Sequence, residues 1–314
     1  MENFYKYKNK LMFPLVYSEK YWADIGSHVF PVQKFKMIKE RLIKEDLVKI
    51  DNFIEPDLPF DEDILLAHTS EWLNKLKNGL LTVNDIIRLE LPYDKSLSDW
   101  FLYTSGGTIL TSKLALKNRV GFHIGGGFHH AFADHGEGFC ALNDIAIALL
   151  KLKKEGLIKK GMVVDCDVHQ GNGTAAIFKK DVDIFTFSIH QGDNYPAIKE
   201  KSDIDVELYS GEGDEKYLNI LRNYFPKLYK ELMPEIIIYV AGADPYKEDQ
   251  LGGLELTKEG LMERDRLVIG EALKLNIPVA VVLGGGYAFK VEDTVEIHIN
   301  TIKICNESME KLKN

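Results

Sequence analysis

The stretch Met162-Val163-Val164-Asp165-Cys166-Asp167-Val168-His169 decides which fold and chemistry we expect of this chain. Its first apolar residues predict a buried strand, and two acids and a histidine follow at every second position. Because residues two apart on an extended chain point to the same side, Asp165, Asp167 and His169 form one row where the strand leaves its sheet. Oxygen and nitrogen ligands in such a row suit a divalent metal, above all zinc. The stretch therefore predicts a metalloenzyme, and other segments should supply a third ligand, a base and an oxyanion stabiliser.

Composition limits the other classes of protein. The 314 residues are 45% hydrophobic and 28% charged, as in a soluble globular α/β enzyme. The net charge of −9, from 39 basic and 48 acidic residues, argues against direct nucleic-acid binding. No apolar run reaches the roughly 18 residues that a membrane span requires. The N-terminus, Met1 to Lys6, has no signal-peptide core, so we expect a cytoplasmic location.

The cysteines predict no disulfide framework. The chain has three of them, Cys140, Cys166 and Cys305. Cys166 lies within the metal-type stretch but on the opposite face of the strand, so we interpret it as a small core residue and not as a ligand.

Short apolar runs recur along the chain and predict buried strands. They lie at 15–17, 120–124, 162–165, 184–189, 236–240 and 279–283. Helical patterns lie at 141–154, 215–230 and 258–275, and Asn143 or Asp144 can cap the first of these helices. Continuous apolar strands indicate burial on both faces and hence a mostly parallel sheet. The alternation of strands and helices predicts a single doubly wound α/β domain over residues 1–314, with helices flanking the sheet.

Polar residues follow four of these strands, at the carboxyl ends where sites form in parallel sheets. One end carries the row described above. His129 and His130 follow the strand at 120–124, Asp244 follows the strand at 236–240, and Tyr287 follows the strand at 279–283. Packing alone does not explain four such ends.

Asp244 has two interpretations. It precedes Pro245, and an acid before proline often caps a turn. Beside Asp167 and His169, a role as third metal ligand explains it better. Two carboxylates and one imidazole leave a coordination position open for water and a substrate carbonyl.

Two glycine-rich segments lead to the remaining candidate residues. Gly125-Gly126-Gly127-Phe128-His129-His130 lacks the spacing of a phosphate-binding loop, and its adjacent imidazoles can divide the work of base and electrostatic stabiliser. Leu283-Gly284-Gly285-Gly286-Tyr287 offers a phenol hydroxyl that can stabilise an oxyanion.

Together these motifs resemble the zinc-dependent histone deacetylase superfamily, which has the arginase–deacetylase fold. The resemblance runs from His28 and Pro31 to Tyr287. It also includes Gly138-Phe139-Cys140, His169-Gln170-Gly171-Asn172-Gly173 and Asp249-Gln250-Leu251-Gly252-Gly253-Leu254, and its details look most like the class IV branch and its bacterial relatives.

The resemblance implies roles for the matching residues. It implies zinc ligands at Asp167, His169 and Asp244, a general base and later acid at His130, its electrostatic partner at His129, a carbonyl-polarising tyrosine at Tyr287, and an acid that orients His129 at Asp165. It further implies an acyl-lysine tunnel lined by Gly138, Phe139 and Tyr195. A structural potassium site is implied near Asp165, Asp167, His169, Ser188 and Ile189.

One position departs from the class I pattern. The residue that would orient His130 is Asn172 and not an aspartate. A neutral partner stabilises an imidazolium less than a carboxylate does, so we predict that His130 is the less basic histidine of the pair. Replacing Asn172 with aspartate should raise the kinetic pKa of His130.

The expected function is hydrolysis of an acylated lysine side chain in a protein or peptide substrate, with one zinc ion per chain. The class IV resemblance allows long fatty acyl groups as well as acetyl. The alternatives are deacetylation of small amines such as acetylpolyamines, a dimetal ureohydrolase of the arginase type, and a catalytically inert acyl-lysine binding module. Iron can occupy such a site too, so the native metal and the oligomeric state stay open.

The remaining histidines and the N-terminal segment have no catalytic role in this interpretation. We expect residues 17–58, with Trp22 and Phe30, to form part of the rim of the site. Polar core or surface positions are expected for His28, His68, His123, His135, His190 and His298.

Overall fold

A single sheet of eight parallel strands forms the centre of the computed structural model, which describes residues 11–313. The strands lie in the order β2-β1-β3-β8-β7-β4-β5-β6. In chain order they are β1 (Leu15–Val16), β2 (Phe53–Ile54), β3 (Val120–His123), β4 (Gly161–Asp165), β5 (Ile184–Gln191), β6 (Ile204–Leu208), β7 (Ile237–Val240) and β8 (Val279–Val282). Every ladder is parallel, which confirms the predicted α/β sheet.

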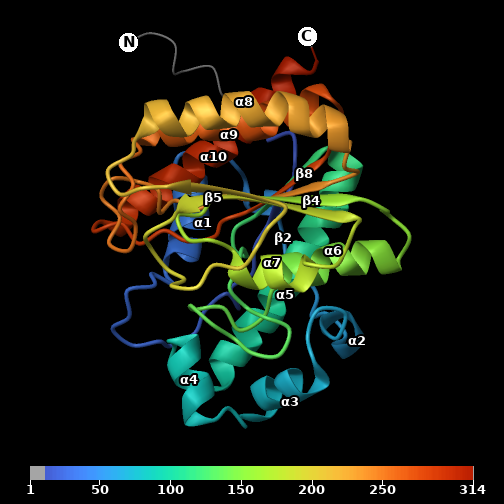
Figure 1. Ribbon diagram of the computed structural model, residues 1–314, viewed down its shortest axis with the longest axis vertical. Coiled ribbons are helices and arrows are strands. Elements are labelled where there is room, and N and C mark those ends of the chain that lie inside the picture. The colour runs from blue at the N-terminus through green and yellow to red at the C-terminus, as the bar shows by residue number, and fades with distance from the viewer. Residues whose placement is uncertain (1–10, 314) are drawn as a thin grey trace.

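Helices cover both faces of this sheet. They are α1 (Lys34–Lys44), α2 (Asp61–Ile64), α3 (Ser70–Asn78), α4 (Val83–Leu89), α5 (Lys95–Asn118), α6 (Asp144–Lys154), α7 (Asn172–Phe178), α8 (Asp214–Leu232), α9 (Lys258–Lys274) and α10 (Val291–Lys311), with a short 3-10 helix at Ile50–Asn52. Helices α8, α9 and α10 lie on one side, and α5, α6 and α7 on the other (Figure 1). Helices α2, α3 and α4 lie beyond α5 and extend the molecule on that side.

The four strands with polar carboxyl ends are neighbours in the sheet, in the order β3-β8-β7-β4. Asp165, the last residue of β4, pairs with Val240, the last residue of β7, in the parallel register. All residues of these four strands are buried, because helices pack on both faces. Their loops therefore converge at one edge in the middle of the sheet.

The start of α6 shows how capping positions one of these loops. Asn143 is the N-cap, and its side chain accepts a hydrogen bond from the Ala146 N–H at 2.9 Å. Asp144 does not cap the helix. Its carboxylate instead accepts from the N–H groups of Gly127 (3.0 Å) and Phe128 (2.8 Å), which fixes the glycine-rich loop that leads to His129.

The sequence pattern missed two strands, β2 and β6, and seven of the ten α-helices among the described residues, including the longest, α5. Strands β2 and β6 lie at the two edges of the sheet, and β6 has the alternating sequence Ile-Asp-Val-Glu-Leu, so neither forms a continuous apolar run. Helix α5 buries residues all around its circumference and has little amphipathic periodicity. The three cysteines are free and buried, and the burial of Cys166 agrees with its interpretation as a core residue.

Two expectations concern the ends of the chain and membranes. No helix within residues 11–313 is long and apolar enough to cross a membrane. Met1 to Lys6, on which the signal-peptide argument depends, lies outside the described residues.

Candidate active site

Asp167, His169 and Asp244 form a buried cluster whose potential ligand atoms lie within 4.8 Å of one another. Nδ1 of His169 is 3.1 Å from Oδ1 of Asp167 and 3.6 Å from Oδ2 of Asp244. The Asp244 side chain does not cap the turn that follows it. Its Oδ1 accepts from the Val168 N–H at 2.9 Å, and its Oδ2 has no hydrogen-bond partner among the described residues.

The electrostatics of this cluster fit a divalent cation. Burial raises the pKa of Asp244 to about 7, and the negative charge of Asp167 contributes to the rise. Two carboxylates buried side by side require a compensating positive charge. An unpartnered carboxylate oxygen, a second carboxylate and an imidazole are the donor set of a three-ligand zinc site with an open position.

A glycine loop closes over the two carboxylates. The N–H of Gly285 donates to Oδ2 of Asp167 at 2.7 Å. A Cβ atom at Gly285 would overlap Oδ2 of Asp244 and would lie 2.8 Å from Oδ2 of Asp167. The loop approaches the cluster this closely only because the position has no side chain.

The two adjacent histidines stand beside the cluster with different partners. Nδ1 of His129 is 2.7 Å from Oδ2 of Asp165, whereas Nδ1 of His130 is 2.7 Å from Oδ1 of Asn172. The two Nε2 atoms are 3.1 Å apart. Asp165 also accepts from the N–H of Asp167 at 3.1 Å, so this acid connects the histidine pair to the cluster.

These partners give the two imidazoles opposite pKa shifts. Burial would lower the pKa of His129, but the carboxylates of Asp165 and Asp167 outweigh it and raise the pKa to about 9. Burial lowers the pKa of His130 well below its usual value, and the charges of His129 and His169 lower it further. The directions agree with the expectation that His130 is the less basic histidine, and they suit one cationic and one neutral imidazole at neutral pH.

Tyr287 faces the same space from the end of the glycine loop. Its backbone N–H donates to Oδ2 of Asp249 at 2.7 Å, and its carbonyl accepts from Nε2 of Gln250 at 2.8 Å. Burial raises the pKa of Tyr287 well above its usual value, and the charges of the nearby carboxylates contribute. The phenol therefore stays protonated and can donate a hydrogen bond.

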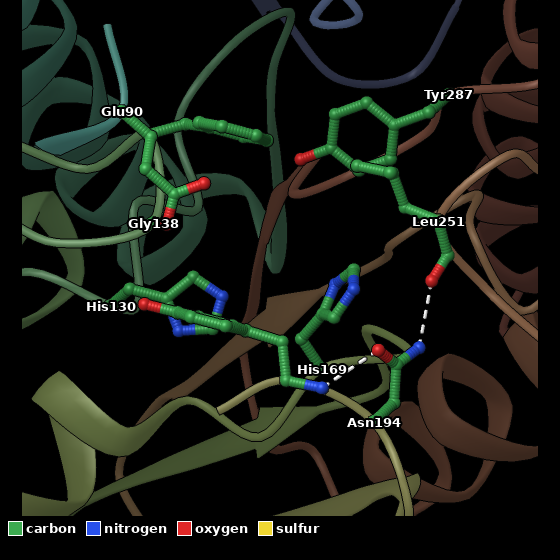
Figure 2. Close-up of a pocket in the computed structure, with 9 residues that line it drawn as sticks. Glu90, His130, Gly138, His169, Asn194, Leu251 and Tyr287 are labelled. Atoms are coloured by element: carbon green, nitrogen blue, oxygen red, sulfur yellow. Dashed lines mark hydrogen bonds between the residues drawn. The ribbon is translucent and has the colours of Figure 1, made fainter. Parts of the chain in front are cut away.

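A cavity of about 150 Å³ opens onto these groups. Figure 2 shows the Tyr287 hydroxyl directed into this cavity, with the imidazoles of His169 and His130 facing it from other elements. The residues expected in a tunnel wall, Gly138, Phe139 and Tyr195, all line this cavity. Glu90, Asn194 and Leu251 also line it, although the sequence did not indicate them for this role. The full lining comprises Glu90, His130, Gly138, Phe139, His169, Asn194, Tyr195, Leu251 and Tyr287.

Among the unexpected lining residues, Asn194 and Leu251 hold one wall together. The Asn194 Nδ2 donates to the carbonyl of Leu251 at 2.7 Å, and its Oδ1 accepts from the N–H of Tyr195 at 2.7 Å (Figure 2). Glu90 follows α4 in a left-handed conformation, with φ of 59°. Leu251 lies in a motif noted from the sequence, but Glu90 stands in no recognisable pattern.

Lys34 is another residue that the sequence did not indicate. It is fully buried, and its Nζ donates to the carbonyl of Gly284 at 3.0 Å, behind the loop that carries Tyr287. Burial lowers its pKa to about 8, although the carboxylates of Asp244 and Asp167 oppose the shift. A lone lysine in a helical segment carries no sequence signal that distinguishes it from a surface residue.

The N-terminal segment, residues 17–58, contributes Phe30 and His28 to the surroundings of the cavity. Phe30 is buried with its ring centroid 5.9 Å from that of Tyr287, whereas the side chain of Trp22 is exposed. His68, His123, His190 and His298 are buried away from the cavity lining, as expected for polar core residues. His28 lies at the rim, where its Nε2 is 3.0 Å from the carbonyl oxygen of Glu90.

Comparisons with known proteins place this geometry in a family. The model of the histone deacetylase domain matches residues 28–302. The chain belongs to the histone deacetylase family. Histone deacetylase 2 of Arabidopsis thaliana is 30% identical over 303 residues, which cover 90% of this chain and 77% of that protein. Membership of this family makes the chain a hydrolase of the deacetylase type.

Other relatives of this histone deacetylase family member span bacteria as well as plants. An uncharacterised protein of Picosynechococcus sp. (strain ATCC 27264 / PCC 7002 / PR-6) is 39% identical over 287 residues, which cover 91% of this chain and 96% of that protein. The acetoin utilization protein AcuC of Staphylococcus aureus (strain MRSA252) is 26% identical over 272 residues, with 79% and 70% covered. The crystal structure of the HDA15 HD domain has a TM-score of 0.79 at 21% identity, covers 94% of this chain and 88% of that one, and supports the fold.

Proposed function

We propose that this histone deacetylase family member is a zinc-dependent hydrolase of acylated amines and that its substrate is the acylated lysine side chain of a protein or peptide. One observation carries the proposal. A buried Asp-His-Asp cluster, two oppositely tuned imidazoles and a protonated phenol share the end of a narrow cavity.

Asp167, His169 and Asp244 would hold the zinc ion. When bound, zinc supplies a Lewis acid that polarises the amide carbonyl and makes the attacking water more acidic. The same donor set also accepts iron. Among residues 11–313 there is one such group of three potential ligands, which argues against the dimetal arrangement of a ureohydrolase.

The surrounding side chains divide the reaction between them. The Tyr287 hydroxyl donates to the carbonyl oxygen as that oxygen gains negative charge. The neutral His130 accepts a proton from the attacking water at Nε2 and then delivers it to the leaving amine nitrogen. His129, held cationic by Asp165, stabilises the negative charge of the transition state. Each of these groups is in place, which supports an enzyme over an inert binding module.

Cavity size supports a short acyl group. The cavity of about 150 Å³ must accept the alkyl chain of the lysine as well as the acyl group. A second cavity shares His130, Phe139 and Tyr287 with the first and is also lined by three other phenylalanines, Phe30, Phe35 and Phe128. Its volume is about 20 Å³, which is room for about one water molecule. We therefore propose acetyl in preference to the long fatty acyl groups that the class IV resemblance allows.

A small acetylated polyamine is the second candidate substrate. Glu90 is an exposed residue that lines the cavity, and a carboxylate there would attract a second cationic amine. The same catalytic groups would serve both substrates.

The resemblance to the family also implies a potassium ion, which would have a structural role. It would lie near Asp165, Asp167, His169, Ser188 and Ile189.

The test is single-turnover hydrolysis by the purified, zinc-loaded protein of three substrates: an acetyl-lysine peptide, a myristoyl-lysine peptide and acetylated spermidine. We expect the acetyl-lysine peptide to be cleaved fastest and Asp244→Ala to abolish the activity together with stoichiometric zinc. Faster cleavage of the myristoyl peptide would overturn the preference for acetyl. Faster cleavage of acetylspermidine would overturn the assignment of a protein or peptide substrate. Absence of cleavage of all three substrates would refute it.

A further inference from the structure

Asn172 lies between the candidate base and a carboxylate that the reaction does not otherwise use. Its Oδ1 is 2.7 Å from Nδ1 of His130, and its Nδ2 donates to Oε1 of Glu137 at 2.7 Å. Asn172 and His130 are buried, with 2% and 4% of their surfaces exposed. The amide of Asn172 therefore has two fixed neighbours and no free choice of partners.

The chemistry of these neighbours determines which way the amide points. A carboxylate only accepts hydrogen bonds, so the NH₂ group of Asn172 must face Glu137. The carbonyl oxygen then faces His130, and because this oxygen also only accepts, Nδ1 of His130 must carry the proton. A neutral imidazole has one N–H, so Nε2 keeps its lone pair. Nε2 is the atom that faces His129, at 3.1 Å.

Glu137 is itself held firmly enough to impose this direction. Its backbone exchanges two N–H···O bonds with Cys140, both of 2.9 Å. Its other carboxylate oxygen, Oε2, lies 3.7 Å from Nε2 of His135, and the acids Glu137 and Asp134 raise the pKa of that imidazole. Burial would raise the pKa of Glu137, but its contacts with His135 and Asn172 outweigh burial and hold the pKa below its usual value.

We propose that Glu137 is a positioning residue that fixes the amide of Asn172 and, through it, the tautomer of His130 that can act as a base. The inference rests on the function proposed above, in which His130 accepts the proton of the attacking water. The role of Glu137 also explains how an asparagine can orient His130. An aspartate at position 172 would not need a neighbour to fix its direction. The two oxygens of a carboxylate are equivalent, whereas an amide orients the histidine correctly in only one of its two directions.

A double-mutant cycle tests the inference through activity. Glu137→Leu removes the acceptor, so the Asn172 amide can turn, and we expect kcat to fall at least about tenfold while KM changes little, since a wrong histidine tautomer can cost far more than this. Glu137→Gln keeps an acceptor oxygen and should retain more activity than Glu137→Leu. In an Asn172→Asp background there is no amide to orient, so Glu137→Leu should not lower kcat further. An equal loss in both backgrounds, or no loss with Asn172 present, would overturn the inference.

Histidine tautomers provide a readout that does not depend on activity. In protein labelled with ¹⁵N-histidine, the signals of His130 are identified by their absence in His130→Ala. We expect the Nδ1–H tautomer in the metal-free and zinc-loaded wild-type protein, and its partial loss in Glu137→Leu. An Nε2–H tautomer in the wild type, or no change in Glu137→Leu, would contradict the role of Glu137. If no acylated amine is hydrolysed, the proposed function fails while this measurement still decides the tautomer.

Discussion

Oδ2 of Asp165 lies 2.7 Å from Nδ1 of His129, and both side chains are buried at the end of β4 and of the glycine-rich loop after β3. The acid comes from the same row as two potential metal ligands, yet it points to the histidine. One short segment thus supplies two members of the Asp167–His169–Asp244 cluster and the hydrogen-bond partner of His129. Burial alone would lower the pKa of His129, but this contact and the charge of Asp167 raise it to about 9.

Asp165→Asn should lower the pKa of His129, because the remaining influence of burial favours the neutral imidazole. We expect kcat to fall about 10²-fold and the basic limb of the pH–rate profile to move to lower pH. Zinc content should stay at the wild-type level, because asparagine can still accept from the N–H of Asp167. An unshifted basic limb would show that His129 is not held cationic by Asp165.

The contact between Asp165 and His129 should also make the free energy of unfolding depend on pH. The folded-state pKa of His129 is raised to about 9, so its contribution is complete below the ordinary histidine pKa of about 6.5 and disappears as the pH rises through about 9. The difference in free energy of unfolding between wild type and Asp165→Asn should therefore shrink across this interval. Denaturant titrations of both proteins at several pH values would measure it.

Asn172→Asp tests the second histidine. An aspartate at 172 would stabilise the imidazolium of His130 and should raise the kinetic pKa on the acidic limb. In this chain the new carboxylate would also face Glu137 at hydrogen-bond distance, so the two acids would share a proton and blunt the effect. We therefore expect the larger shift in the double variant Asn172→Asp/Glu137→Gln. A profile of kcat/KM against pH that is the same for all three proteins would contradict the assignment of His130 as the base.

The sequence was sufficient to predict which polar residues lie together, because each of them follows the end of a buried strand. Asp167, His169, Asp244 and Tyr287 each follow a buried apolar run, and parallel strands place such ends at one edge. The order β3-β8-β7-β4 that brings them together depends on which crossovers the helices make, and no local pattern records it. The second role of Asp165 came from the family resemblance, since spacing alone gave it the same weight as Asp167.

Supporting residues escaped prediction for a different physical reason. Lys34 contacts Gly284 and Glu137 contacts Asn172 across long separations in the chain, through one hydrogen bond each. Nothing in the periodicity around these residues differs from that of surface charges. Their roles become visible only when the folded chain buries them or their partners.

Tyr287→Phe should separate substrate polarisation from binding. Loss of the phenol hydroxyl removes a donor to the developing oxyanion, so we expect kcat to fall about 10²- to 10³-fold with little change in KM. The backbone N–H bond to Asp249 stays, so zinc content and melting temperature should match the wild type. Tyr195→Phe is the matched control, because Tyr195 lines the same cavity with its ring edge-to-face against His130. An equal fall in kcat in the two variants would contradict the role of the Tyr287 hydroxyl as the donor to the oxyanion.

Gly285→Ala should disrupt the cluster of potential metal ligands, Asp167, His169 and Asp244, because it adds a methyl group next to two of them. The added Cβ would overlap Oδ2 of Asp244 and would approach Oδ2 of Asp167 to 2.8 Å, so one carboxylate or the loop must move. We expect substoichiometric zinc, loss of activity and a smaller rise of the melting temperature when zinc is added to metal-free protein, because a ligand stabilises only as much as it binds. Gly270→Ala is the control: an added Cβ there meets nothing within 4 Å in the middle of α9, so the change should stabilise by about 0.4–1 kcal/mol and leave zinc binding intact. Wild-type zinc affinity in Gly285→Ala would mean that the cluster does not need the close approach of this loop.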